Sequence, residues 1–403
     1  MPRPKPPAPA PRTDETLHCR HFGECGGCSL LDQPIDWQLH DKIAACEKLL
    51  APYLGERKIE APKTTWTPRH FRTRLLYPVK GDRDNLPILG IYAFRSHHLV
   101  QIDECRTQDV WLTEFGRAAE RVLRELRLQP FHADSGRGYV KALWARLASG
   151  TGQVLAGVVT RPGPFAQSAA LATGLMEAAA KLPPMRKERK LVGVVHSISE
   201  REDEFLLGER HVPLRGPDHV IDRRDDLTFK ISAGSFYQVH AEAGELLYKP
   251  ALQMCGNVKG KHVIDGYGGV GAFGLRLAKA GAASVTIVED NAAACRDAAY
   301  NITANKLPRV TVVREPFATA KFPAEPDLMV VDPPRSGLQS HGVARVLVAK
   351  PKRLLHVACA ADSLASDLAE LTANGYRVTA MRLCDLFPHT EHVELLTMLE
   401  RGV

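Results

Sequence analysis

The sequence has no long hydrophobic run: none of its apolar stretches approaches the roughly 20 residues that a membrane-spanning helix needs. Its N-terminus also lacks the apolar core of a signal peptide. The two absences exclude a membrane-spanning chain and make disulfide bonds improbable, because intracellular cysteines stay reduced. We therefore expect a cytoplasmic protein.

Neither sign of charge dominates, since 53 basic residues oppose 46 acidic ones and leave a net charge of +7. This excess permits RNA or DNA as a partner without requiring either. The length of 403 residues predicts two or three domains with an ordinary hydrophobic core. Residues 1–16 stand apart: they are rich in proline and carry Arg3, Lys5 and Arg12, which predicts a disordered, solvated basic arm.

What the sequence does have is a glycine-dense turn between a predicted buried strand and a predicted helix, within residues 263–278. Such a turn presents backbone N–H groups to a nucleotide-like ligand. Its spacing, Gly269-x-Gly271-x-x-Gly274, is a weak signal alone. The following apolar run ends in Glu289, whose carboxylate can accept hydrogen bonds from ribose hydroxyls. Nicotinamide and S-adenosylmethionine folds share this arrangement, so later segments must distinguish the ligand.

Two later predicted strands end in chemically capable residues. One runs into Asp332-Pro-Pro, where the prolines remove backbone donors and fix an extended exit from the sheet. The other ends in Cys359. Ligands of an open α/β sheet bind outside the carboxyl ends of its strands, so Asp332 and Cys359 are expected to face the crevice opened by the glycine turn. A nicotinamide enzyme has no need of a cysteine there.

Three cysteines cluster near the N-terminus as Cys19-x5-Cys25-x2-Cys28, with glycines between and beside them. Glycine lets a short loop wrap several thiolates around one centre, so the cluster predicts a metal site. Cys105, between a predicted strand and a predicted helix, is the best fourth ligand. Spacing alone does not separate structural zinc from a [4Fe–4S] cluster, because both accept four thiolates. The cysteines in helical patterns are expected to be buried core thiols: Cys46, Cys255 and Cys295.

Residues 62–235 alternate strand patterns with one or two helices, which predicts an α+β region. Residues 71–78 and 89–95 resemble the two arms of a hairpin rich in aromatic and basic side chains. Such side chains can hold RNA phosphates and stack bases, although for any single residue a solvated surface role is more common. The candidate phosphate ligands are Arg69, Arg72, Arg74, Lys80 and the basic residues of 186–190.

Taken together, these motifs resemble those of the RNA uracil-C5 methyltransferase family, and most of all its cluster-containing ribosomal RNA branch. The motifs, in the family's order, are the four cysteines, Ser235-Phe-Tyr-Gln238, the glycine turn, Asp332-Pro-Pro-Arg335, Cys359 and Phe387-Pro-His-Thr-Glu-His-Val-Glu394. The resemblance covers nearly the whole chain. It implies a Rossmann-like methyltransferase domain over 236–403, an α+β RNA-recognition region over 62–235, and a cluster loop with an amphipathic helix over 17–61.

The resemblance also implies roles for individual residues. Cys359 would be the nucleophile and Glu394 the general base. S-adenosylmethionine would be bound by Gln238, Tyr267, Glu289 and Asp332. A [4Fe–4S] cluster would be held by Cys19, Cys25, Cys28 and Cys105. The implied substrate is a single uridine in a folded RNA.

The chemistry needs these residue types for independent reasons. C5 of uracil attacks a methyl sulfonium only after electrons are pushed into the ring, and a thiolate adding at C6 does this. The adduct must then lose its C5 proton so that the thiolate can leave, which requires a base over that carbon. Cys359 and Glu394 supply the two groups, and Asp332 could accept a hydrogen bond from the uracil N3–H of a flipped base. His389 and His392 are interpreted as structural hydrogen-bonding residues.

The sequence departs from the family pattern beside the nucleophile. Ala358 precedes Cys359 and Ala360-Ala361-Asp362 follows it, where the family commonly has serine and Asn-Pro. An amide that would orient the substrate or the cysteine is missing, which bears on rate and substrate identity. Gly266-Tyr267-Gly268 replaces a Leu-Tyr-Cys-like triplet, and we expect S-adenosylmethionine binding to be unaffected. No RNA-binding barrel precedes Cys19, so residues 62–235 are expected to grip the RNA.

We therefore predict a monomeric enzyme that makes 5-methyluridine in 23S ribosomal RNA. The open alternatives are the same chemistry on transfer RNA and an iron–sulfur RNA-binding protein that has lost catalysis. The weakest alternative is a nicotinamide oxidoreductase, because it leaves Cys359 and the Asp-Pro-Pro turn unexplained. Each site residue also has a structural interpretation: a packed core thiol at Cys359, an exposed strand-end charge at Glu394, and a helix cap at Gln238.

Overall fold

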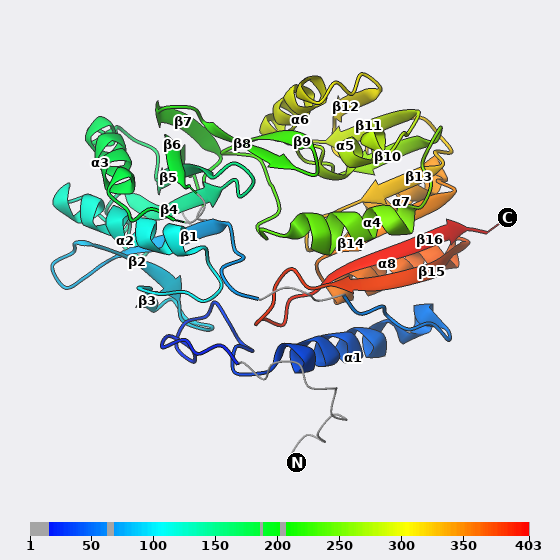
Figure 1. The fold of residues 1–403 in the computed structure, drawn as a ribbon, viewed down its shortest axis with the longest axis horizontal. Helices are drawn as coiled ribbons and strands as arrows, with labels where there is room; N and C mark the ends of the chain where they lie inside the picture. Colours follow the sequence, from blue (N-terminus) through cyan, green and yellow to red (C-terminus); the bar gives the residue numbers. More distant parts are fainter. Residues whose placement is uncertain (1–15, 63–67, 186–187, 202–206, 403) are drawn as a thin grey trace, which may run out of the picture.

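The computed structural model describes residues 16–62, 68–185, 188–201 and 207–402. The predicted basic arm and part of the basic patch at 186–190 therefore lie outside the described residues. Within these ranges the chain forms two seven-stranded sheets joined by a two-stranded hairpin (Figure 1). No helix in the described ranges is long and apolar enough to cross a membrane.

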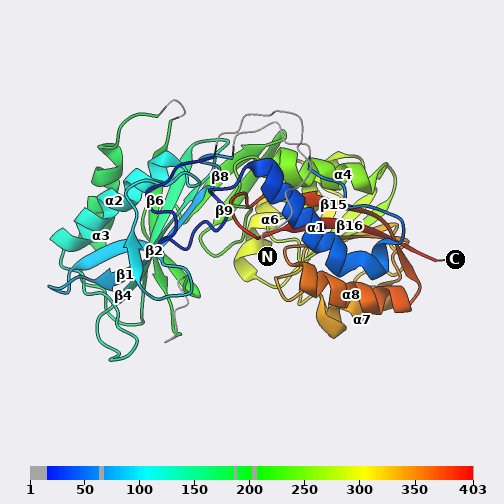
Figure 2. The same ribbon diagram turned by 90° about the horizontal axis from the view of Figure 1, so that it is seen from below.

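The first sheet has the strand order β3-β2-β1-β4-β5-β6-β7 and is antiparallel except for the pairing of β5 with β6. Its strands are β1 (Arg74–Gly81), β2 (Pro87–Tyr92), β3 (Leu99–Gln101), β4 (Val140–Leu147), β5 (Gln153–Thr160), β6 (Lys190–Ile198) and β7 (Arg210–Arg215). Helices α2 (Val110–Glu125) and α3 (Ser168–Ala180) cover one face with a shared apolar core (Figure 2). The predicted hairpin is present as β1 and β2, with Val79 opposite Leu89.

Helix α2 shows how local sequence set this part of the fold. Asp109 precedes the helix, and its carboxylate accepts a hydrogen bond from the Trp111 N–H at 3.0 Å. This is the N-cap arrangement that short polar side chains favour. Trp111, Phe115 and Ala119 follow at helical spacing and are buried against the sheet, so this is the helix predicted after Cys105. The strand predicted before Cys105 is present as β3, whereas the pattern did not predict β7.

The hairpin of β8 (His219–Arg224) and β9 (Leu227–Ser232) lies between the two sheets. The side chains of Asn301 and Asn305, on helix α6 (Ala292–Ala304) and at its end, accept hydrogen bonds from β9 backbone amides. On the other side, the Thr151 hydroxyl donates to the Ile221 carbonyl at 2.6 Å. The hairpin thus contacts both halves, and the boundary expected after residue 235 stays a prediction.

The second sheet has the order β12-β11-β10-β13-β14-β16-β15. Its strands are β10 (His262–Gly266), β11 (Ser284–Glu289), β12 (Val310–Arg314), β13 (Leu328–Val331), β14 (Arg353–Ala358), β15 (Tyr376–Cys384) and β16 (Glu394–Arg401). Strands β10 to β14 are parallel. From β10 the chain adds β11 and β12 on one side and then β13 and β14 on the other, and open α/β sheets bind ligands where the strand order reverses in this way. The last strand, β16, is inserted antiparallel between β14 and β15.

Helices cover both faces of this sheet. One face packs against α4 (Lys249–Cys255), α5 (Ala272–Lys279) and α6, with the π-helical turn Gly244–Tyr248 before α4. The other packs against α7 (Gln339–Ala349), α8 (Ala361–Ala373) and, from the N-terminal end of the chain, α1 (Ile35–Leu54). This α/β arrangement agrees with the predicted fold class.

The segment predicted as one unit, residues 17–61, contacts both halves. Leu39, Cys46 and Leu50 bury the predicted apolar stripe of α1 in the core beside α8 and β15. The preceding loop instead lies against the first sheet, where Cys25 pairs with Ala93. Figure 1 shows this segment running beneath both sheets.

Candidate active site

The site residues predicted on the second sheet gather at one edge. Glu289 ends β11, and Asp332 and Cys359 directly follow β13 and β14. Because these strands are parallel, their carboxyl ends meet at the same edge. Glu394 begins β16, and since β16 runs antiparallel, its first residue lies at that edge too. The inserted last strand therefore brings a residue from the far end of the sequence to the crevice.

The glycine turn wraps around a buried carboxyl group. Asp265 has no exposed surface, and its Oδ2 accepts a hydrogen bond from the Gly274 N–H at 2.7 Å. A Cβ atom at Gly268 or Gly274 would lie within 2.9 Å of this carboxylate, so only glycine permits the approach. Burial raises the pKa of Asp265 to about 7. Its Oδ1 has no partner among the described residues, which leaves a buried acceptor under the turn.

Glu289 and Tyr267 flank this turn. The Glu289 carboxylate accepts hydrogen bonds from the N–H groups of Gly269 and Asn291, both at 2.8 Å, and burial raises its pKa. Tyr267 adopts a left-handed backbone conformation with φ of 58°, which costs energy for a non-glycine residue and is concentrated at functional sites. Its ring packs on Phe317 with 4.9 Å between centroids. The two predicted ligand-binding residues thus border one turn.

Cys359 and Glu394 occupy facing positions on neighbouring strands. The register of β14 and β16 places Ala358 opposite Leu395, so the next positions in each direction, 359 and 394, face each other. Directly opposed residues of an antiparallel pair project to the same side. Glu394 is only 3% exposed, which rules out the exposed strand-end charge. Cys359 is half-buried, unlike the buried thiols of Cys46, Cys255, Cys295 and Cys384.

The three groups influence one another electrostatically. Burial, and then the charges of Glu394 and Asp332, raise the pKa of the Cys359 thiol, while Arg335 opposes the rise. Burial and the charge of Asp332 raise the pKa of Glu394 well above its usual range, and burial raises that of Asp332. Two buried carboxyl groups within range of each other resist ionising together.

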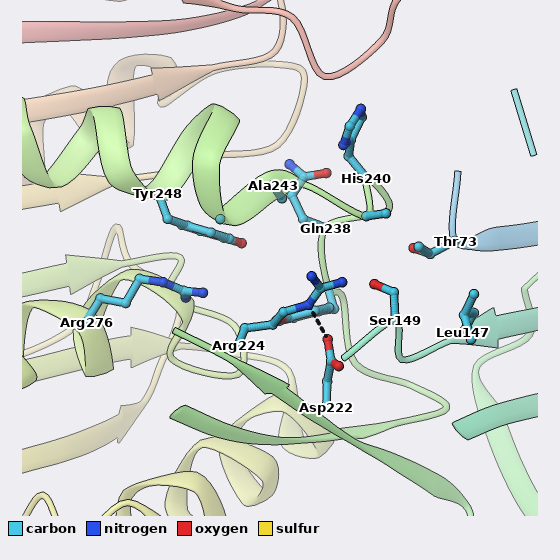
Figure 3. A pocket seen from close by; sticks show the side chains of 13 residues that line it. Thr73, Leu147, Ser149, Asp222, Arg224, Gln238, His240, Ala243, Tyr248 and Arg276 are labelled. Carbon is cyan, nitrogen blue, oxygen red and sulfur yellow. Dashed lines mark hydrogen bonds and ion pairs between the residues drawn. The ribbon is translucent and has the colours of Figure 1, made fainter. Parts of the chain in front are cut away.

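Gln238 lies apart from this edge, in a pocket where the two halves meet. Figure 3 shows its amide between Tyr248 on one side and Thr73 on the other. The helix-cap interpretation is wrong, because the ring of His240 accepts the hydrogen bond from the Glu242 N–H. Burial raises the pKa of Tyr248 in this pocket well above its usual range, and the charges of Asp332 and Glu394 add to the rise.

Two residues of the site were missed from the sequence. Arg335 ends the Asp-Pro-Pro-Arg motif, and its charge lowers the pKa of Cys359 and so favours the thiolate. Its position after two prolines at the end of a predicted strand could have indicated that Arg335 belongs to the site. Tyr248 had no such signal, because its place in the pocket of Gln238 depends on how the segment before α4 packs.

The four N-terminal cysteines line one pocket, beside Arg72 and the backbone of Gly27. Burial and the charges of the other three thiols raise the pKa of Cys28 to about 12. Backbone amides point at two of the sulfurs: Gly27 N–H to Cys25 Sγ at 3.4 Å, and Gln108 N–H to Cys105 Sγ at 3.3 Å. Across the described ranges, no three His, Cys, Asp or Glu side chains form a ready-made site for one metal ion.

A basic cleft separates the first sheet from α6. Its floor includes Arg146, whose guanidinium donates to the carbonyls of Ser232 and Ser235 at 2.8 and 2.6 Å. Phe236, next in the chain, is 61% exposed at the cleft. Other basic residues of the cleft are Arg74, Arg210, His211 and Arg296. Among the predicted phosphate ligands that the structure describes, only Arg74 lines this cleft.

Comparison with known proteins agrees with this geometry. Residues 324–402 match the family described as tRNA (Uracil-5-)-methyltransferase, and residues 226–359 match the methyltransferase small domain. An uncharacterized RNA methyltransferase of Listeria monocytogenes is 30% identical over 393 residues, 94% of this chain and 83% of the relative. One of Caldanaerobacter subterraneus is 29% identical over 390 residues, 95% and 84% of the two chains.

Among solved structures, the fold is similar to that of a Pyrococcus abyssi tRNA (uracil-54, C5)-methyltransferase in complex with S-adenosyl-L-homocysteine. The TM-score is 0.70 at 24% identity, covering 94% of this chain and 86% of the other. Together, the fold and the site at the strand ends define a Rossmann-like methyltransferase that uses S-adenosylmethionine. More narrowly, the chain belongs to the RNA uracil-C5 methyltransferase family and is an enzyme that methylates RNA.

Proposed function

We propose that the enzyme methylates C5 of one uridine in a folded RNA through a covalent adduct with Cys359. The observation that carries the proposal is the opposed placement of residues 359 and 394 at the carboxyl edge of the sheet. A thiol and a buried carboxyl group on the same side of one crevice can reach the two adjacent carbons of a single base. A nicotinamide oxidoreductase would use neither group.

The steps follow from these two groups. The Cys359 thiolate, favoured by Arg335, adds to C6, and the electrons of the C5–C6 double bond move to C5 and the neighbouring carbonyl. C5 attacks the methyl group of S-adenosylmethionine, the methyl–sulfur bond breaks, and S-adenosylhomocysteine leaves. Glu394 then removes the C5 proton, the double bond re-forms, and the Cys359–C6 bond breaks. Asp332 beside them would accept the uracil N3–H.

Covalent trapping tests this mechanism. With 5-fluorouridine RNA and S-adenosylmethionine, the methylated adduct has fluorine in place of the C5 proton, so Glu394 cannot resolve it. The enzyme should then run with the RNA as one band on a denaturing gel. An iron–sulfur RNA-binding protein without catalysis would give no such band. If the band is absent, the proposed mechanism is wrong.

For S-adenosylmethionine we propose the predicted set: Gln238, Tyr267, Glu289 and Asp332. The support is the glycine turn, its unpaired buried acceptor on Asp265, and Glu289 at the end of the neighbouring strand. Glu289 would exchange one of its backbone partners for the ribose hydroxyls. Gln238, in the adjoining pocket, would contact the part of the donor that points away from the turn.

Replacing Glu289 by alanine should weaken S-adenosylhomocysteine binding by about 10- to 100-fold, since hydrogen bonds to charged groups contribute about 1.5–3 kcal/mol. Titration calorimetry measures the change in Kd. Glu325→Ala, an exposed carboxylate beyond the opposite edge of the sheet, is the matched control and should bind normally. Equal Kd values for Glu289→Ala and the unaltered enzyme would exclude Glu289 from the ligand set.

We propose 23S ribosomal RNA as the substrate, with transfer RNA as the alternative. The cysteine loop supports the first, because it carries the resemblance to the ribosomal RNA branch; the family name and the Pyrococcus enzyme support the second. The basic cleft with the exposed Phe236 would hold phosphates and stack a base in either case. Deleting the gene and mapping which uridine loses its methyl group decides between them.

We also propose that Cys19, Cys25, Cys28 and Cys105 hold a [4Fe–4S] cluster. The donor set fits: four thiols line one half-buried pocket, backbone amides point at two of them, and their mutual repulsion would be offset by a cationic centre. A zinc ion also accepts four thiolates, so the metal content distinguishes the two. When bound, the cluster would staple the loop, since the reaction transfers no net electrons.

Anaerobically purified enzyme should therefore contain about four iron atoms and a similar amount of acid-labile sulfide per chain. Cys105→Ala should lose most of both, because three thiolates no longer complete the ligand set. Cys46→Ala, in the core beside α8, should retain them and serves as the control. One zinc atom per chain with no iron would contradict the assignment.

A further inference from the structure

His389 is the point where the N-terminal segment is tied to the loop that leads to Glu394. This loop, residues 385–393, connects the end of β15 to the first residue of β16, and we call it the base loop. His389 is 2% exposed and has a left-handed φ of 66°. Its carbonyl accepts hydrogen bonds from the N–H groups of Ser29 at 2.9 Å and Leu30 at 3.0 Å. These two residues directly follow Cys28.

Gln38 of α1 holds the other polar groups of His389. The His389 N–H donates to Gln38 Oε1 at 2.7 Å, and the ring Nδ1 lies 3.2 Å from Gln38 Nε2. The ring Nε2 lies 2.9 Å from the Pro68 carbonyl, which can only accept. Burial lowers the pKa of the ring, and Nε2 donates to the Pro68 carbonyl, which leaves Nδ1 without a proton. The Gln38 amide therefore fixes the backbone of His389 through Oε1, and its Nε2 lies beside the ring.

The Gln38 amide is itself held in one orientation. It is fully buried, and its Nε2 donates to the carbonyls of Leu30 and Gln33, both at 2.8 Å. Exchanging its oxygen and nitrogen would set N–H against the His389 N–H and oxygen against two carbonyls. The side chain is thus a rigid link between the residues after Cys28 and the base loop.

A second contact from the same helix face supports the link. Lys42, one helical turn after Gln38, lies 2.7 Å from Asp385 Oδ1 and donates to the Phe387 carbonyl at 3.0 Å. Both charged side chains are at most 3% exposed. The base loop is therefore held by α1 at its start and at its middle, and Glu394 comes five residues after His389.

We propose that Gln38 is a positioning residue for the general base: through His389 it holds the base loop so that Glu394 stands over C5 of the adduct. This rests on the proposed function. The described hydrogen bonds of Gln38 go to Leu30, Gln33 and His389, none of which belongs to the proposed catalytic pair. Its loss should slow proton removal from C5 while leaving addition of the thiolate to C6 nearly intact.

The test uses Gln38→Met in the full-length enzyme, which keeps the side-chain length and removes the hydrogen bonds. Turnover on uridine RNA should fall on the order of 10-fold, as small misplacements of catalytic groups do. Adduct formation on 5-fluorouridine RNA should stay within about twofold of the unaltered enzyme. With uridine RNA, a methylated protein–RNA adduct should accumulate. Tyr376→Phe, which removes one buried hydrogen bond to the Pro351 carbonyl at the far end of β15, should leave both rates unchanged.

A merely structural role for Gln38 would lower both rates together or lower neither, and either result overturns the proposal. If Gln38→Met does not fold, Gln38→Glu replaces it, because the carboxylate keeps the acceptor for the His389 N–H and loses the two donors. The same split between the two rates is then required. If the unaltered enzyme forms no adduct at all, the proposed function fails, and the role of Gln38 fails with it.

Discussion

Replacing Cys359 by alanine is expected to lower RNA methylation by at least about 10⁴-fold, because removing a catalytic nucleophile leaves only binding and electrostatic contributions to the rate. The covalent complex with 5-fluorouridine RNA should disappear completely. Binding of S-adenosylhomocysteine should be unchanged, since the thiol is not in the proposed ligand set. Denaturing gels and a methyl-transfer assay measure the first two, and calorimetry the third.

Cys255→Ala is the matched control for this experiment. Cys255 is a buried thiol at the end of α4, in the core on the other side of the strands from α8. Losing it should reduce stability slightly and leave the covalent complex intact. A covalent complex formed by the Cys359→Ala enzyme would show that another nucleophile attacks the base.

Glu394→Gln is expected to reduce turnover by about 10²- to 10⁴-fold, the range typical of removing a general base. The amide keeps the size and burial of the side chain but cannot take the C5 proton. Addition and methyl transfer precede that step, so a methylated adduct should accumulate on ordinary uridine RNA. Transfer of a labelled methyl group into a protein–RNA band that survives denaturation measures this.

Glu391→Gln provides the comparison, because Glu391 belongs to the same loop and is exposed. Its turnover should match that of the unaltered enzyme, and no adduct should accumulate. If Glu394→Gln instead prevents adduct formation on 5-fluorouridine RNA, Glu394 acts before methyl transfer and its assignment as the C5 base is wrong.

The electrostatics explain why this carboxyl group is suited to the role. Burial and the neighbouring Asp332 raise the pKa of Glu394, so the carboxylate is a stronger base than an exposed one. The effect on Cys359 is opposite: burial and the charges of Glu394 and Asp332 raise its pKa and reduce the thiolate fraction, and a backbone hydrogen bond and Arg335 offset part of this rise. Binding of a uracil whose N3–H faces Asp332 would relieve part of this repulsion.

Much of the second sheet could be predicted from the sequence. The apolar runs before the glycine turn, Asp332 and Cys359 are strands, and α5 follows the turn as expected. Parallel strands buried on both faces read as nearly continuous apolar runs, so local pattern is informative there. The short strands β7 and β8 carry no comparable apolar run, because most of their residues are exposed or only partly buried, so local pattern did not indicate them.

The sequence by itself determined which residues have the chemistry: a thiol and an acid near strand ends, an acid after the glycine turn, and four clustered cysteines. Those are local properties of side-chain type and spacing. Only the tertiary structure decided that residues 359 and 394 face each other, because this depends on inserting β16 antiparallel beside β14. It likewise decided that Gln38 meets His389, 351 positions along the chain, since such contacts come from packing that no local pattern records.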